Sequence, residues 1–113
     1  MSLERGLELI SAGAYFDAHE ALEQEWRGAP EEERDFLQGL VHVVVAWHHA
    51  GQGNRPGAER QLEKAARRLR AYAPRHRCVD VSRLLGQVEA AAARVAVDHL
   101  DLLPARVDFG EEP

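Results

Sequence analysis

Residues Phe36 to Ala50 read FLQGLVHVVVAWHHA. A helix over this stretch would be apolar on nearly every side, which is typical of a helix at the centre of a fold. The stretch is shorter than the roughly 20 residues that a membrane span needs. It also carries one glutamine and three histidines. We therefore interpret it as a buried central helix, and we expect no membrane partner.

Two helices are expected before the central one. Apolar side chains recur at helical spacing from residue 3 to residue 10, and the breaker Ala12-Gly13-Ala14 follows them. A second helix should span residues 16–27 and end at Gly28-Ala29-Pro30, because proline disfavours helical geometry in the residue before it. The acidic run at residues 31–35 then suits the N-terminus of the central helix.

Two further helices are expected after it. Gly51-Gln52-Gly53-Asn54 predicts a turn, and Pro56 stands where a first-turn proline belongs. Pro74 should close this fourth helix, and Asp80 can cap a fifth. Each of these two predictions is based on apolar residues that recur along one face of a helix. In the fourth helix they are Ala58, Leu62, Ala65, Leu69 and Tyr72. In the fifth helix they are Val81, Leu84, Leu85, Val88, Ala92 and Val95. We find no convincing pair of strands.

The short glycine turns pair neighbouring helices into hairpins. The sequence therefore predicts an all-α fold, a compact bundle of about five helices built from two αα-hairpins plus a C-terminal helix. We expect one domain over residues 1–103, followed by a polar and extended C-terminal tail over residues 104–113.

The composition limits the class of protein. The chain has 113 residues, of which 45% are hydrophobic and 29% charged, as in ordinary globular domains. A single cysteine, Cys78, allows no internal disulfide. No long apolar stretch follows Met1, so we expect no secretory signal and a cytoplasmic location. The net charge of −5 argues against a general nucleic-acid binder.

The charge is unevenly distributed along the chain. Residues 17–35 contain eight acids, whereas residues 64–77 contain six bases and no acid. Two interpretations stay open for the basic segment. It forms a solvated helix face that attracts the acidic one, or it forms a patch for an anion or a partner.

Polar side chains interrupt two of the predicted apolar faces. His19 and Glu23 are one helical turn apart, on the side of their helix that carries the apolar residues. The central helix has one narrow polar stripe, from which His48 points away; the stripe consists of Asp35, Gln38, His42 and His49. Because short loops favour antiparallel hairpins, we expect the two polar sets to meet across one helix–helix interface.

Three kinds of chemistry are open to these residues. The run HEALE at residues 19–23 departs from the zinc-protease helix motif, which needs histidine at its fifth place. A site for a divalent metal could still use His19, Glu23 and a histidine of the central helix such as His42. The same residues could serve as a metal-free acid–base site. They could instead form a hydrogen-bonded network that holds the two hairpins together.

The run YFDAHEALE at residues 15–23 with Trp26, then FLQGL at residues 36–40, His49 and Gly53-Asn54, resembles a small prokaryotic family of all-helical proteins. That family is known only as domain of unknown function 309, and the resemblance covers roughly residues 3–90. It implies a compact helical fold, and it supplies no activity. The positions that it marks as characteristic are His19, Glu20, Glu23, Trp26, Gln38 and His49. Family members often carry glutamine at position 42, which weakens a metal role for His42.

We therefore expect a small helical module that binds a protein or a small molecule in the groove between the two hairpins. The alternative is an enzyme, either a metal-assisted hydrolase or a metal-free acid–base enzyme, that uses the same residues. An enzyme needs His19 and Glu23 to be open to solvent, whereas a sealed network would favour the binding module. The substrate or partner and the oligomeric state, including a homo-oligomer, stay open.

Overall fold

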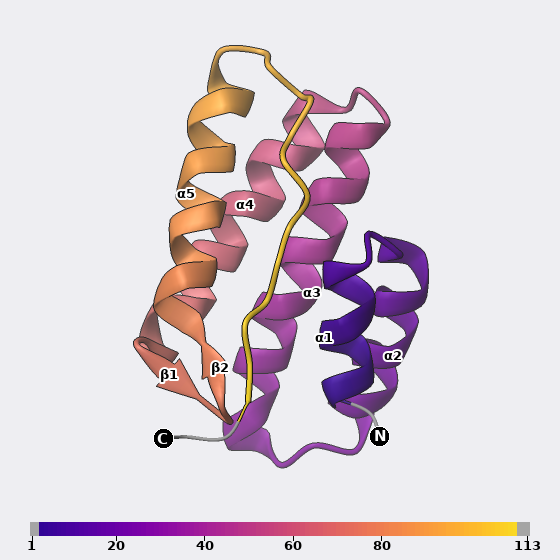
Figure 1. Ribbon diagram of the computed structural model, residues 1–113, viewed down its shortest axis with the longest axis vertical. Coiled ribbons are helices and arrows are strands. Elements are labelled where there is room, and N and C mark those ends of the chain that lie inside the picture. Colours follow the sequence, from indigo (N-terminus) through magenta and orange to yellow (C-terminus); the bar gives the residue numbers. More distant parts are fainter. Residues whose placement is uncertain (1–2, 111–113) are drawn as a thin grey trace.

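Five α-helices make up most of the protein, whose computed structural model describes residues 3–110 (Figure 1). They are α1 (Leu3–Ser11), α2 (Tyr15–Arg27), α3 (Glu31–Gly51), α4 (Arg55–Leu69) and α5 (Val81–Ala96). A short 3-10 helix, η1 (Arg70–Tyr72), follows α4, and the two-residue strands β1 (Arg75–His76) and β2 (Val79–Asp80) precede α5. The predicted all-α fold class is confirmed.

Helix α3 lies at the centre, between the α1–α2 pair and the α4–α5 pair (Figure 1). Leu40 and Val44 of α3 are fully buried, as expected for a central helix. Helix α2 packs on one side of α3 and helix α4 on another. No helix between residues 3 and 110 is both long and apolar enough to cross a membrane.

A glycine allows α3 and α4 to pack closely. A Cβ atom at Gly39 would lie 2.8 Å from side-chain carbons of Leu69 on α4, closer than such atoms approach. Gly39 therefore brings the backbone of α3 near the apolar face of α4, where Leu69 is fully buried.

Side-chain caps begin the last two helices, as the sequence predicts for Asp80. The Asn54 carboxamide oxygen accepts the Gly57 N–H of α4 at 3.0 Å, and the Asp80 carboxylate accepts the Arg83 N–H of α5 at 3.0 Å. Each cap satisfies a backbone donor that the first turn of a helix leaves without a partner.

The strand pair was not expected. Strands β1 and β2 pair antiparallel, and Arg77 and Cys78 between them have positive φ angles of 50° and 63°.

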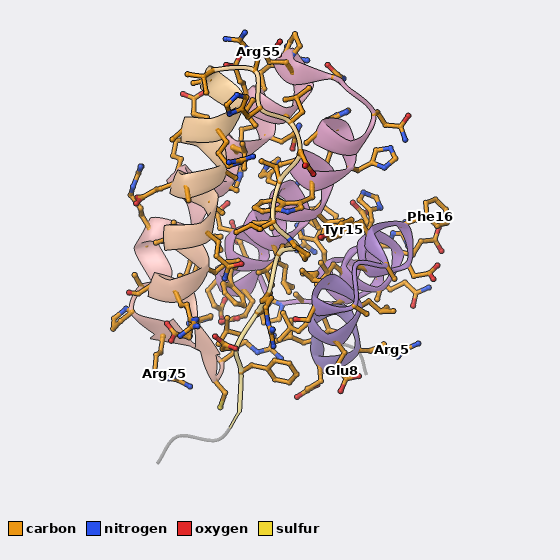
Figure 2. The ribbon with its side chains drawn as sticks, turned by 45° about the horizontal axis from the view of Figure 1, so that its top comes forward. Arg5, Glu8, Tyr15, Phe16, Arg55 and Arg75 are labelled. Carbon is orange, nitrogen blue, oxygen red and sulfur yellow. The ribbon has the colours of Figure 1, made fainter. Side chains whose placement is uncertain are left out.

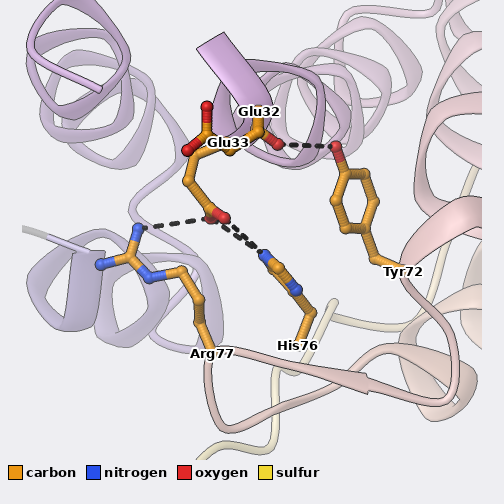
Figure 3. Close-up of polar contacts among 5 residues, drawn as sticks. All are labelled: Glu32, Glu33, Tyr72, His76 and Arg77. Carbon is orange, nitrogen blue, oxygen red and sulfur yellow. Dashed lines mark hydrogen bonds and ion pairs between the residues drawn. The ribbon is translucent and has the colours of Figure 1, made fainter. Parts of the chain in front are cut away.

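Figure 3 shows the contacts that hold this hairpin to the first turn of α3. The Glu33 carboxylate lies 2.9 Å from His76 Nε2 and 3.8 Å from Arg77, and the Tyr72 hydroxyl donates to the Glu32 carbonyl at 3.3 Å. Strands of two residues show no alternation in sequence, so they were not predicted.

The C-terminal segment, residues 97–110, runs extended along the molecule and back to β2 (Figure 1). An extended course was expected only from residue 104 onward. The burial of Ala105 and Val107, which belong to the hydrophobic core, was not expected in a polar tail. Tyr15 Oη accepts the N–H of Ala105 at 3.3 Å, and Ser11 Oγ accepts the N–H of Val107 at 3.1 Å. The expected tail also includes residues 111–113, which lie outside the described range.

Candidate functional site

The polar stripe of α3 faces α4. Two contacts join the two helices directly, Asp35 with Arg68 and His42 with Gln61 at 2.7 Å. A third joins His49 to Asn54, the residue that caps α4, at 3.2 Å. We call these three contacts the polar ladder. Successive rungs are seven residues apart along the chain on both sides, which corresponds to about two helical turns. The side chains of His42 and His49 therefore contact residues of α4 and of its cap, at the interface between α3 and α4.

His42 is the most deeply buried polar residue of the ladder, with an exposed fraction of 8%. Its Nδ1 donates to Gln61 Oε1, whereas its Nε2 is buried and has no hydrogen-bond partner among the described residues. Burial lowers the pKa of His42 below its ordinary value of 6.5, the hydrogen bond with Gln61 opposes this shift, and the positive charges of Arg68, Lys64 and Arg67 add to it. The net effect favours the neutral form of the ring.

A different set of residues lines an open cavity between α2 and α3, at the junction of the two hairpins. This α2–α3 groove has a volume of about 230 Å³ and is lined by Tyr15, Phe16, His19, Val44, Val45 and His48. Phe16 stands at its edge with 74% of its surface exposed. Figure 2 shows Phe16 pointing away from the body of the protein and Tyr15 pointing inward.

His19 and Glu23 lie together beside this groove. The distance from His19 Nε2 to the Glu23 carboxylate is 3.9 Å, which is within ion-pair range and beyond a hydrogen bond. The two side chains are 40% and 33% exposed. The pair is therefore open to solvent and is not part of a sealed network.

The other predicted site residues are dispersed. Glu20 is exposed on α2, and Gln38 is half-buried on α3. Trp26 packs against the core at the end of α2, where the Arg34 guanidinium lies 5.1 Å from its ring centre. The structure thus brings His19 and Glu23 together but leaves the remaining candidates at separate places.

The His19–Glu23 pair of α2 was expected to meet the polar stripe of α3, and it does not. The stripe of α3 and the groove residues of α3 are separated by roughly 100° around the helix axis, so His19 approaches Val44, Val45 and His48 while His42 approaches Gln61. Among residues 3–110, no three His, Cys, Asp or Glu side chains are grouped so that they could hold a metal ion. The metal candidates His19, Glu23 and His42 are therefore not gathered at one point.

Sequence reasoning missed Tyr15, Phe16 and His48 as groove residues. His48 was set aside because it points away from the polar stripe, yet this direction places it opposite His19. A usable signal was that Phe16 borders the apolar face of α2 without belonging to it. Such a position is often left exposed when the helix packs.

Helix α2, which forms one wall of the groove, is rich in acids. Helix α2 carries Asp17, Glu20, Glu23 and Glu25, against a single base, Arg27, in its last turn. A positively charged partner would therefore be attracted to this side of the protein.

These features define a small all-helical protein with a solvent-open groove between two helical hairpins. The sequence model for the domain of unknown function DUF309 matches residues 3–61, and the chain belongs to this family. All six groove residues fall within the matched part. The chain is also 34% identical over 75 residues to the uncharacterized protein YpuF of Bacillus subtilis (strain 168). The match covers 66% of this chain and 41% of YpuF, so the chain spans less than half of that relative's length.

Proposed function

We propose that the protein is a binding module whose α2–α3 groove receives an apolar side chain from a basic, amphipathic segment of a partner protein. The observation that carries this proposal is Phe16, a large aromatic side chain left exposed at the edge of an open apolar groove. Exposed aromatic side chains beside a concave surface commonly anchor protein–protein contacts.

The size of the groove favours a side chain over a whole cofactor. Its volume of about 230 Å³ lies below the roughly 300–1,000 Å³ of sites that enclose drug-sized ligands, so it suits one side chain or a comparably small group. The acids of α2 favour a partner with lysine or arginine beside its apolar anchor, because opposite charges speed and orient association. His19 and His48 on the two walls could accept or donate hydrogen bonds at the rim of such a contact.

A pair of synthetic helical peptides tests this proposal. One peptide carries leucine on one face and lysine on the other, and its twin has glutamate in place of lysine. We expect the lysine peptide to bind at physiological salt, as measured by calorimetry, and the glutamate twin not to bind. Phe16→Ser should weaken binding at least about ten-fold, the loss of one buried aromatic anchor.

The matched control is Val97→Ser, which removes another exposed apolar side chain that does not line the groove. It should leave the affinity unchanged. Equal affinity for the wild-type protein and for Phe16→Ser would rule out the groove as the binding surface. Equal binding of both peptides would rule out the basic partner.

Solvent access supports a second candidate function, an acid–base enzyme. His19 is open to solvent in a concave site, and the Glu23 carboxylate lies beside its ring. Hydrolysis of an activated aryl ester, measured with zinc and with a chelator, tests this candidate. Turnover that disappears in His19→Ala and survives in Phe16→Ser would favour the enzyme over the binding module.

A further inference from the structure

A second cavity lies between α5 and the C-terminal segment. Its volume is about 260 Å³. Trp47 and Ala91 are its most deeply buried lining residues, and Leu102 and Leu103 of the C-terminal segment add further apolar surface. Arg94 and Arg106 lie at its wall. We call it the α5–tail cavity.

Hydrogen bonds hold both walls of this cavity in place. The side chain of Gln87 on α5 bonds both backbone groups of Arg106, donating to the carbonyl at 2.7 Å and accepting the N–H at 2.9 Å. The Trp47 indole N–H donates to the Leu103 carbonyl at 2.8 Å. The cavity is therefore formed before any ligand arrives, which reduces the entropy that binding must overcome.

The charge at this cavity is positive in a protein of net charge −5. None of its lining residues is acidic. Asp108, the acid that follows Arg106 most closely along the chain, is already paired with Arg83 at 2.8 Å. Arg94 donates one N–H to the Asp101 carbonyl at 3.2 Å. Within residues 3–110, the Arg106 guanidinium has no hydrogen-bond or ion-pair partner.

The wall formed by the C-terminal segment also exposes apolar surface to solvent. Leu103 lines the cavity, and 80% of its surface is exposed. An apolar group that entered beside Trp47 would also cover Leu103, and both would lose contact with water. A simple inorganic anion would leave this apolar surface unused, whereas an uncharged apolar molecule would leave Arg106 without a partner.

We propose that the α5–tail cavity binds a small organic carboxylate with an apolar body, such as a medium-chain fatty acid. The carboxylate pairs with the guanidinium of Arg106, which can offer two parallel N–H donors. The hydrocarbon chain lies on Trp47 and Ala91 and is covered by Leu103. Arg94 plays the smaller role, because its guanidinium already donates to Asp101.

The two tryptophans of the chain make a direct test possible. In the full-length Trp26→Phe variant, Trp47 is the only tryptophan, so its fluorescence reports on the cavity. Octanoate should change this fluorescence in a saturable way, and octan-1-ol, which has no charge, should bind at least ten-fold more weakly. Arg106→Gln should raise the dissociation constant for octanoate at least ten-fold, and Arg94→Gln should raise it less.

Several variants keep the test decisive. Arg106→Lys retains the charge, so it should bind octanoate better than Arg106→Gln does if both are folded by circular dichroism. Arg60→Gln, on the exposed face of α4 and outside this cavity, should bind like the parent. Phe16→Ser should also bind like the parent, which separates this site from the α2–α3 groove.

Three results would overturn the proposal. They are the absence of a saturable Trp47 response, equal affinity for octanoate and octan-1-ol, and equal affinity of the parent and Arg106→Gln. A fourth result would also overturn it and would point to a different ligand for the cavity. If a peptide that ends in leucine with a free carboxylate bound where octanoate did not, the cavity would serve a protein terminus and not a small molecule.

Discussion

His42 on α3 and Gln61 on α4 are joined by a hydrogen bond of 2.7 Å, and this pair is the middle rung of the polar ladder. The rungs on either side lie seven residues away on both helices. In an antiparallel pair, a step forward on one helix must match a step back on the other. A slip of one turn would therefore leave every rung unpaired. Because a buried polar group without a partner is costly, the middle rung, where His42 is buried, favours a single register.

Removing one member of the middle rung should be more harmful than replacing both. Gln61→Leu leaves the His42 ring buried with no partner for either nitrogen, and we expect a loss of about 1–3 kcal/mol in the free energy of unfolding. The double variant His42→Leu with Gln61→Leu should lose less. Urea unfolding of the two single variants and the double variant measures this coupling. Strictly additive losses would mean that the two side chains do not interact.

The stability of the protein should fall in mild acid, partly because of His42. Burial holds the pKa of His42 below its ordinary value of 6.5 in the folded state, so below pH 6.5 the unfolded chain binds a proton more readily than the folded one. The contribution is fully present above pH 6.5 and is lost as the pH falls toward the folded pKa.

The variant His42→Gln removes this titrating group and keeps a polar side chain at the rung. Its free energy of unfolding should therefore depend less steeply on pH between about pH 7.5 and pH 5 than that of the wild type. Urea unfolding across this range makes the comparison. Parallel curves for the two proteins would show that His42 has the same pKa in both states.

The central position of α3 predicts a large cost for a cavity there. Leu40 is fully buried, so Leu40→Ala should lower the free energy of unfolding by about 2–5 kcal/mol. Urea denaturation followed by circular dichroism measures this loss. A change of less than about 0.5 kcal/mol, the range of ordinary surface substitutions, would contradict a central α3.

Substitution of two helical glycines by alanine should change the free energy of unfolding in opposite directions. Gly39→Ala places a methyl group against Leu69 and should cost about 1–3 kcal/mol, the usual penalty for overpacking. A Cβ atom at Gly86 of α5 would meet nothing within 4 Å apart from its chain neighbours and the backbone of its own helix. Gly86→Ala should therefore stabilise the protein by about 0.5–1 kcal/mol, the helix propensity difference. Thermal unfolding of both variants tests the contrast, and equal effects would argue against the close α3–α4 approach.

The helices could be predicted because their signals are local. Gly13, Pro30 and Gly53 interrupt the helical pattern, and the side chain of Asp80 can reach the first turn of its own helix. The β1–β2 hairpin lacked such a signal, since Glu33 holds it from 43 positions away in the chain. The burial of Val107 was missed for a similar reason, because its contacts belong to α1 and the core.

The candidate site was predicted only in part. His19 and Glu23 are one turn apart on one helix, so helical geometry alone places them together. The partner of this pair across the groove was expected to be the polar stripe of α3, and instead it is the face with His48. The role of Phe16 depends on how much of it the neighbouring helix leaves uncovered.

The amino-acid sequence by itself determined the fold class, the places of the five helices and the central place of α3, because periodicity, breakers and caps act within a few residues. It did not determine the end of α4, which was expected at Pro74 and lies at Leu69, where the 3-10 helix η1 begins. The tertiary structure decided which face of α3 meets which neighbour. A helical wheel gives the angle of His42 around its own axis, but it does not say whether α2 or α4 lies at that angle. Side-chain packing sets that choice, and Gly39 against Leu69 is one contact that brings α4 to the polar stripe.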